Sequence, residues 1–161
     1  MPNVKPIPDG YRNLTPYLIV VGAALAADFY KNVFGAIERM RLGAPEGKIG
    51  HAELTIGDSV VMLADEHTAM GALGPRSIGG SPVTLHLYVA DVDAVVAKAV
   101  AAGAILKHPV ENQFYGDRAG RIEDPFGHIW HIATHVEDIS HEEIGRRAAA
   151  MAQGQKPEQQ S

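Results

Sequence analysis

The sequence contains no cysteine among its 161 residues. This absence excludes a disulfide framework, a thiolate metal site and a thiol nucleophile. The 14 basic residues form no run and are outnumbered by 19 acidic ones, so we expect no nucleic-acid partner. No apolar stretch approaches the roughly 20 residues that span a membrane, and the N-terminus does not read as a signal peptide. We therefore expect no membrane partner and a cytoplasmic location.

What the chain does contain is an internal repeat. The run from Thr15 to Val20 resembles the run from Thr84 to Val89, and each is followed by a helical pattern that ends in a glycine. The matched positions lie 68 to 70 residues apart, with Thr15 on Thr84, Gly35 on Gly103, Glu53 on Glu123 and Met62 on His131. A repeat of this length indicates one supersecondary unit used twice. Two such open sheets can face each other across a pocket.

Each half reads as a β-α-β-β-β module within one domain, residues 1–161. Module one covers about 14–64, with a helix at 23–34 carrying Leu25, Phe29 and Val33, and strands at 14–21, 37–42, 51–56 and 59–64. A linker rich in glycine, proline and serine follows at 65–82 and is also a candidate flap. Module two covers about 83–135. Ser140 and Glu143 form a capping-box pattern for a last helix at about 140–153.

Several motifs together resemble the vicinal oxygen chelate superfamily, which includes glyoxalase I, bleomycin-resistance proteins and extradiol dioxygenases. They are Asp28-Phe29-Tyr30-x-x-Val33-Phe34-Gly35-Ala36, Val89-x-Asp91-Val92-Asp93-Ala94, Ala101-Ala102-Gly103-Ala104 and Asp124-Pro125-Phe126-Gly127-His128. The chain resembles an uncharacterised bacterial glyoxalase-like branch in particular. The resemblance implies an α+β fold of two βαβββ modules with a cup-shaped mixed sheet, and a homodimer.

The resemblance also implies four metal-ligand positions, on the first and last strands of each module. Here they hold Thr15, Met62, Thr84 and His131, of which only His131 is a competent ligand for a hard divalent ion. We therefore expect no cofactor and no metal at the usual family site. A displaced site built from His86, His131 and either Glu53 or His51 remains an alternative.

Strand alternation predicts which other side chains share the polar face of each sheet. Ala52, Leu54 and Ile56 suit the side that packs on the helices, so His51 and Glu53 belong on the opposite side. The same reasoning gives a set of candidate catalytic residues, His51, Glu53, His86 and His131, and candidate ligand-binding residues, Tyr17, Tyr88, Arg118 and Arg121.

Two functions fit this polar face. One is a glyoxalase-like protein that binds a small polar metabolite and carries out lyase or isomerase chemistry on it. The other is a non-catalytic protein of the bleomycin-resistance type that sequesters a drug or metabolite. Outside this face, we expect Trp130 in the core or an interface, His128 to bond locally, and Asp124-Pro125 to form a turn.

Overall fold

The computed structural model describes residues 3–154, so residues 1–2 and 155–161 of the predicted domain lie outside it. Module one contains β1 (Tyr17–Val20), α1 (Ala23–Phe34), β2 (Ile37–Gly43), β3 (Ile49–Ile56) and β4 (Ser59–Asp65). Module two contains β5 (Thr84–Tyr88), α3 (Val92–Ala101), β6 (Ile105–Asn112), β7 (Asp117–Glu123) and β8 (Ile129–His135). The last described element is α4 (His141–Gly154). The predicted βαβββ repeat and the terminal helix are confirmed.

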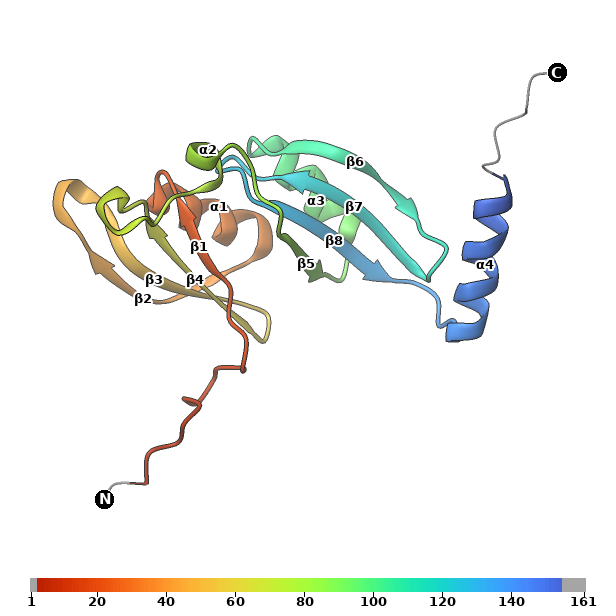
Figure 1. Ribbon diagram of the computed structural model, residues 1–161, viewed down its shortest axis with the longest axis horizontal. Helices are drawn as coiled ribbons and strands as arrows, with labels where there is room; N and C mark the ends of the chain where they lie inside the picture. The colour runs from red at the N-terminus through yellow and green to blue at the C-terminus, as the bar shows by residue number, and fades with distance from the viewer. Residues whose placement is uncertain (1–2, 155–161) are drawn as a thin grey trace.

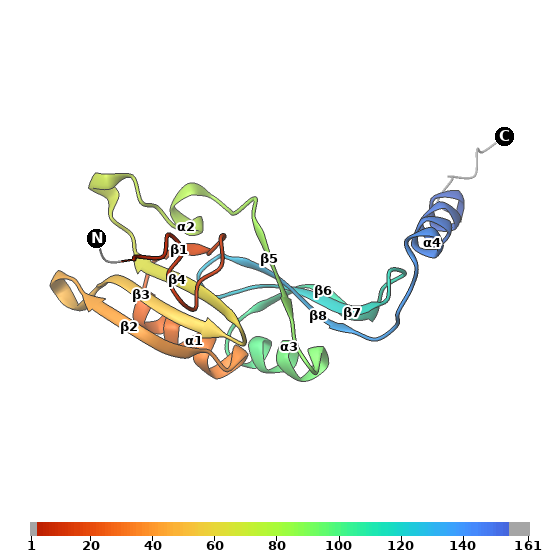
Figure 2. The same ribbon diagram turned by 90° about the horizontal axis from the view of Figure 1, so that it is seen from below.

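Each module folds into one four-stranded mixed sheet. The strand orders are β1-β4-β3-β2 and β5-β8-β7-β6, with the first pair of each sheet parallel and the others antiparallel. The modules lie side by side along the long axis of the molecule, not face to face (Figures 1 and 2). Within residues 3–154, each helix is too short or too polar to cross a membrane.

The helix α1 covers one face of the first sheet with small and aromatic residues. Its buried side chains are Ala23, Ala26, Ala27, Phe29, Tyr30 and Val33. The apolar stripe predicted from a spacing of four is wrong at Leu25, which is 67% exposed. The helix packs on the sheet through the side that carries the alanines at 23, 26 and 27, so Leu25 faces away from it. Gly35 ends the helix with φ +68°, as the sequence predicted.

Strand pairing corrects the alignment of the two halves. Glu53 pairs with Met62, whereas Arg121 pairs with His131. Because Met62 and His131 are equivalent, the structural counterpart of Glu53 is Arg121 and not Glu123. The predicted equivalence was wrong by two residues, a shift that keeps the side chain on the same face of the strand.

A buried carboxylate joins the modules. Asp124, 2% exposed, accepts hydrogen bonds from the Tyr30 hydroxyl of α1 at 2.6 Å and from the Trp130 indole N–H at 2.9 Å. It also accepts from the backbone N–H groups of Phe126 and His128. Asp124 does begin a turn, as predicted, but it also holds α1 of one module against the β7–β8 turn of the other. The His128 imidazole, in turn, lies 3.1 Å from the Ile19 carbonyl in the other module, so its bond is not local.

The linker packs against both modules. It contains a short 3-10 turn, η2 (Thr68–Met70), and one helical turn, α2 (Pro75–Ile78). A Cβ on Gly74 would lie 2.8 Å from the Ile19 carbonyl oxygen, and one on Gly127 would lie 2.8 Å from Pro75. These contacts place the segment directly against β1 and the β7–β8 turn.

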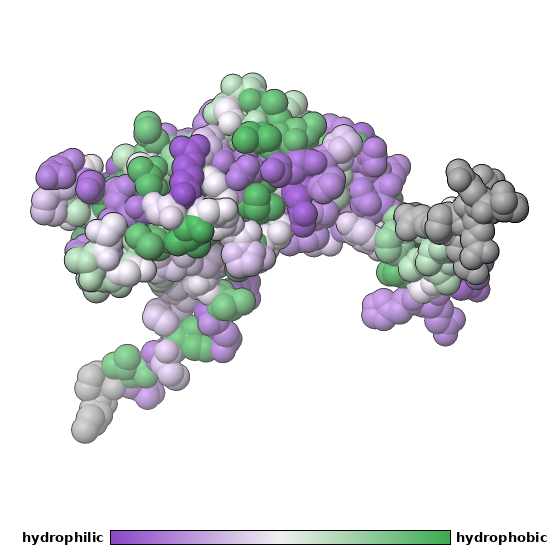
Figure 3. All heavy atoms as spheres, turned by 45° about the horizontal axis from the view of Figure 1, so that its top comes forward, coloured by the Kyte–Doolittle hydropathy of each residue, from purple (hydrophilic) through white to green (hydrophobic). Residues whose placement is uncertain are grey.

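The segment before β1 and helix α4 both extend from the body (Figures 1 and 3). The Ser140 hydroxyl accepts the backbone N–H of Glu143, which confirms the predicted cap. The Glu143 carboxylate pairs with Arg146 and Arg147, so the reciprocal half of the capping box is not formed. No residue of α4 is buried.

Candidate functional site

The predicted polar residues form two rows, one on each sheet. Cα pairing aligns Tyr17, Met62 and Glu53 in the first sheet, and it aligns His86, His131 and Arg121 in the second. Both rows lie on the face away from the helices, as alternation predicted. Since the sheets are side by side, the structure does not bring the eight predicted site residues together in one site.

A pocket of about 460 Å³ opens on the polar face of module two. Its lining residues are Thr84, His86, Tyr88, Tyr115, Asp117, Arg121 and His131. Four of the predicted residues therefore meet here. The pocket is of the size that suits a small molecule. None of its lining residues comes from module one.

His131 lies beside Arg121 and several aromatic rings in this pocket. Its ring centroid is 4.8 Å from that of His86, and its Nε2 is 3.3 Å from the Tyr115 hydroxyl. Burial, with the nearby charges of His86 and Arg121, lowers the pKa of His131 below its ordinary 6.5. His131 is thus uncharged at neutral pH and has a ring nitrogen able to accept a proton.

Arg121 supplies the positive charge of the pocket. Its Nη2 lies 3.5 Å from the Thr84 hydroxyl, and its Nε is buried without a hydrogen-bond partner among the described residues. Buried N–H groups are nearly always paired, so an unpaired donor is an uncommon feature of this wall.

The far wall of the pocket is a hydrogen-bonded group around Asp117, which is 3% exposed. Asp117 accepts the Tyr88 hydroxyl at 2.7 Å and pairs with His135 Nδ1 at 2.8 Å. Although burial opposes it, these two bonds lower the pKa of Asp117, and the bond to the carboxylate raises the pKa of Tyr88. His135 is also bonded to Asp138, and both partners raise the pKa of His135. The wall therefore carries ionised Asp117 and protonated Tyr88.

We expect His135→Gln to lower the melting temperature in a pH-dependent way. Because the folded pKa of His135 is raised, its stabilisation is fully present below the ordinary value of 6.5 and is lost as pH rises through the folded pKa. Because the folded pKa of Asp117 is lowered, the stabilisation that Asp117 contributes is present above pH 3.8, its ordinary pKa, and is lost as pH falls through the folded pKa. The difference from the parent protein, measured by thermal melts from pH 3 to 9, is thus largest between about pH 4 and 6.5. His67→Gln, at an exposed site in the linker, is the control, and a pH-independent difference would contradict the assignment.

Arg118 lies outside this pocket. Its guanidinium donates to Asp93 at 2.7 and 2.8 Å and to Asn112 at 3.2 Å. The neighbouring Asp117 points to Tyr88 and His135, so the two residues do not pair with each other. Both residues lie on β7, and neighbouring side chains on a strand point in opposite directions.

The remaining predicted residues form a separate cluster in module one. His51 lies between Tyr17 and Glu53, at 2.7 Å from the Tyr17 hydroxyl and 3.1 Å from the Glu53 carboxylate. Tyr11, which the sequence analysis missed because it precedes the first predicted strand, donates to the other Glu53 oxygen. Tyr115 was likewise missed as a site residue, since its turn has no periodicity to indicate a direction.

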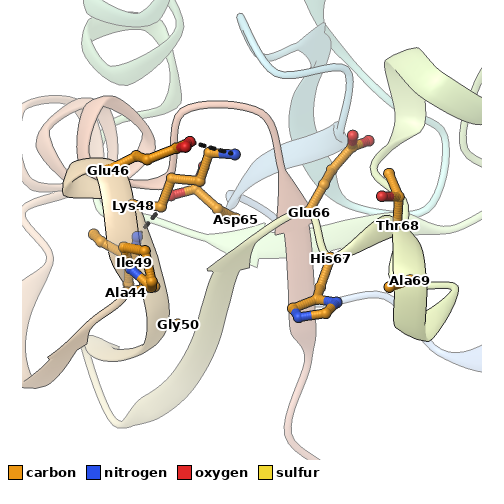
Figure 4. A pocket seen from close by; sticks show the side chains of 11 residues that line it. Ala44, Glu46, Lys48, Ile49, Gly50, Asp65, Glu66, His67, Thr68 and Ala69 are labelled. Carbon is orange, nitrogen blue, oxygen red and sulfur yellow. Dashed lines mark hydrogen bonds and ion pairs between the residues drawn. The ribbon is translucent and has the colours of Figure 1, made fainter.

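Another cavity, of about 360 Å³, lies at the end of module one between residues 44–50 and 65–69 (Figure 4). Asp65 on its wall accepts the backbone N–H groups of Gly22, Ala23 and Ile49, and Glu66 accepts that of Gly74. Both carboxylates thus hold the chain in place, and we do not assign this cavity as the functional site.

No group of three or more histidine, aspartate or glutamate side chains within residues 3–154 is arranged to hold a metal ion. His86 and His131 lie in module two, whereas His51 and Glu53 are bonded to tyrosines in module one. The displaced metal site stays a prediction.

Comparison with known proteins agrees with this architecture. Residues 14–132 match the family model of the glyoxalase/bleomycin resistance protein/dioxygenase superfamily. The chain belongs to this superfamily. An uncharacterised protein of Mycobacterium tuberculosis is 44% identical over 144 residues, which cover 88% of this chain and 84% of the relative. An uncharacterised protein of Arabidopsis thaliana is 34% identical over 73% of this chain and 74% of its own length.

Solved structures show the same fold. The crystal structure of TioX from Micromonospora sp. ML1 superposes with a TM-score of 0.62 and 26% identity, covering 78% of this chain and 99% of TioX. The structure of the Arabidopsis thaliana protein gives a TM-score of 0.62 at 31% identity, covering 76% of this chain and 98% of its own. These relatives establish the superfamily and leave the ligand open.

Proposed function

We propose that this superfamily member binds a small polar molecule bearing an anionic or carbonyl oxygen in the pocket of module two, and moves a proton on it. The observation that carries the proposal is the placing of His131, uncharged at neutral pH, in the same pocket as the Arg121 guanidinium. A neutral imidazole can take a proton from a C–H bond next to a carbonyl group, while a guanidinium stabilises the negative charge that develops on the oxygen. This is the half-reaction of an isomerase or a lyase.

We propose that this chemistry needs no divalent metal. The donors at the family's four ligand positions do not fit such an ion, since Thr15, Met62 and Thr84 offer no imidazole or carboxylate beside His131. His131 is therefore available as a base. The cytoplasmic location expected from the sequence stays a prediction.

We also propose a homodimer. Large apolar side chains are exposed on β2 and before β1, among them Leu14 at 87%, Ile37 at 69% and Leu42 at 55%. Strand β2 is exposed along its whole length. Exposed apolar surface of this kind is typical of a protein–protein interface.

The experiment is a thermal-shift screen of small carboxylates and carbonyl compounds, followed by proton–deuterium exchange on the hits in D₂O by ¹H NMR. We expect hits whose C–H signal next to the carbonyl group is lost in the presence of the protein. His131→Gln should retain the thermal shift but slow the exchange by about 10²-fold or more, the usual contribution of a positioned base. Arg121→Met should lose the thermal shift. The screen is run after EDTA treatment and again with added Mn²⁺ or Ni²⁺.

Two outcomes would contradict the proposal. Exchange that survives in His131→Gln would remove His131 as the base, and hits that appear only with added metal would remove the metal-free chemistry. Thermal shifts without exchange would instead favour the second candidate function, sequestration in the manner of bleomycin-resistance proteins. The observation that favours that candidate is the same lack of metal ligands at Thr15, Met62 and Thr84.

A further inference from the structure

The cluster in module one has a geometry of its own. The Tyr17 hydroxyl lies 2.7 Å from His51 Nδ1, and His51 Nε2 lies 3.1 Å from a Glu53 oxygen. The second Glu53 oxygen accepts the hydroxyl of Tyr11, and the Arg39 guanidinium lies 4.8 Å from the centroid of the Tyr11 ring. Four side chains from β1, β3 and the N-terminal segment thus form one hydrogen-bonded line.

The hydrogen bonds of this line run in one direction. The bonds from Tyr11 and His51 lower the pKa of Glu53, so the carboxylate is ionised and can only accept. His51 Nε2 must then carry the proton that it shares with Glu53. In the neutral imidazole this leaves Nδ1 as an acceptor, so the Tyr17 hydroxyl donates to it.

Burial falls along the line from the carboxylate to the phenol. Glu53 is 7% exposed, His51 is half-buried, and Tyr17 is 47% exposed. Tyr11 closes the inner end, where its bond to Glu53 raises the pKa of the Tyr11 hydroxyl and keeps it protonated. Tyr17 is the most exposed residue of the line. Partial burial of its hydroxyl and the charge of Glu53 raise the pKa of Tyr17, so the phenol is protonated at neutral pH and needs a base in order to react.

We propose that Tyr17, His51 and Glu53 form a second reactive site, in which the Tyr17 hydroxyl is a nucleophile toward small activated carbonyl compounds. The arrangement has the parts that activate a hydroxyl group: a base within hydrogen-bond reach and a buried carboxylate that orients the base. It is separate from the module-two pocket, where the position equivalent to Tyr17 holds His86. The proposal therefore does not depend on the ligand of that pocket.

The step balances without another reactant. The Tyr17 oxygen bonds to the carbonyl carbon, and its proton passes to His51 Nδ1, which gives an imidazolium beside the Glu53 carboxylate. The bond from the carbonyl carbon to its leaving group breaks, and the leaving group takes the proton from His51. The products are an acylated Tyr17 and the protonated leaving group.

N-acetylimidazole, which acetylates phenols and releases imidazole, is the probe. The full-length protein is treated at pH 7.5, and acetylation of each tyrosine is followed by peptide mass spectrometry. Tyr88 is the internal control, because it is more exposed at 59% but donates to Asp117, a carboxylate whose lowered pKa makes it a weaker base than an imidazole. We expect Tyr17 to react at least tenfold faster than Tyr88. We expect His51→Gln to lower the rate of Tyr17 acetylation by about 10²-fold or more. Glu53→Gln should have a smaller effect in the same direction.

Equal rates at Tyr17 and Tyr88, or a Tyr17 rate unchanged in His51→Gln, would overturn the proposal. Circular dichroism checks that each variant is folded. A second measurement needs no variant: two-dimensional ¹H–¹⁵N NMR of the histidine rings reports which nitrogen of His51 carries the proton. We expect the proton on Nε2 and an unprotonated Nδ1. The opposite tautomer would overturn the proposed transfer of the proton from Tyr17 to His51.

Discussion

Asp124→Ala should destabilise the protein by about 3–5 kcal/mol, the range expected when a buried, hydrogen-bonded charge is removed from its partners. The side chain is 2% exposed and accepts four hydrogen bonds. Its loss leaves the Tyr30 hydroxyl and the Trp130 N–H without an acceptor, in a place that water does not reach. Urea unfolding followed by circular dichroism measures the change.

Two variants separate the charge from the packing. Tyr30→Phe removes one donor and keeps the ring, so it should cost about 1.5–3 kcal/mol, as for a single bond to a charged group. Asp124→Asn keeps the shape but replaces one acceptor oxygen by a donor, which faces either Tyr30 and Trp130 or the backbone N–H groups of Phe126 and His128. Its stability should fall near that of Asp124→Ala. If Asp124→Asn were as stable as the parent protein, the junction would not depend on the carboxylate.

Gly116→Ala should be the second large effect, about 2–4 kcal/mol. The residue has φ +100°, and a Cβ there would lie 2.3 Å from the Glu137 carbonyl oxygen. The positive φ alone costs about 1–2 kcal/mol for a residue with a side chain, and the overlap adds to it. The Gly116 carbonyl also accepts the backbone N–H groups of Val136 and Glu137, so the clash pushes apart two segments that are bonded to each other.

Gly79→Ala is the matched control, because Gly79 has φ +94° and nothing lies within 4 Å of its added Cβ. It isolates the backbone cost, and its effect should be about 1–2 kcal/mol. Thermal melts of both variants give the comparison. Equal losses of stability would show that the Glu137 carbonyl moves away from the added Cβ without a measurable loss of stability. Because Tyr115 and Asp117 flank Gly116 and line the pocket, Gly116→Ala should also weaken any hit from the thermal-shift screen.

The fold could be predicted because its signals are local and repeated. The helix at 23–34, the cap at Ser140 and the alternation of His51 and Glu53 each depend on neighbours in sequence, and all are confirmed. The alternation also gave the correct face for His86, Arg121 and His131. Periodicity fixes the side of a strand on which a residue lies, and that much of the site follows from it.

The rest depends on contacts that periodicity does not encode. Tyr11 reaches Glu53 from a segment without regular structure, and Asp117 is a buried acceptor for Tyr88, which lies 29 residues earlier in the chain. The orientation of the two modules relative to each other also could not be predicted from the sequence. That orientation keeps His51 and His131 in separate clusters, and it depends on long-range bonds such as that from Tyr30 to Asp124.

The junction has a consequence for how a duplicated unit acquires a single assembly. The turn between β3 and β4 comprises two residues, 57–58, whereas its counterpart between β7 and β8 comprises five, 124–128. The longer turn carries both Asp124 and Phe126, which contacts Phe29 and Tyr30 of α1. Two identical copies would have two equivalent ways to dock. By the strand register, the second hairpin is one residue longer than the first. This longer turn, with Asp124 and Phe126, makes the pair directional, so divergence at a single hairpin can give a doubled gene product one defined arrangement.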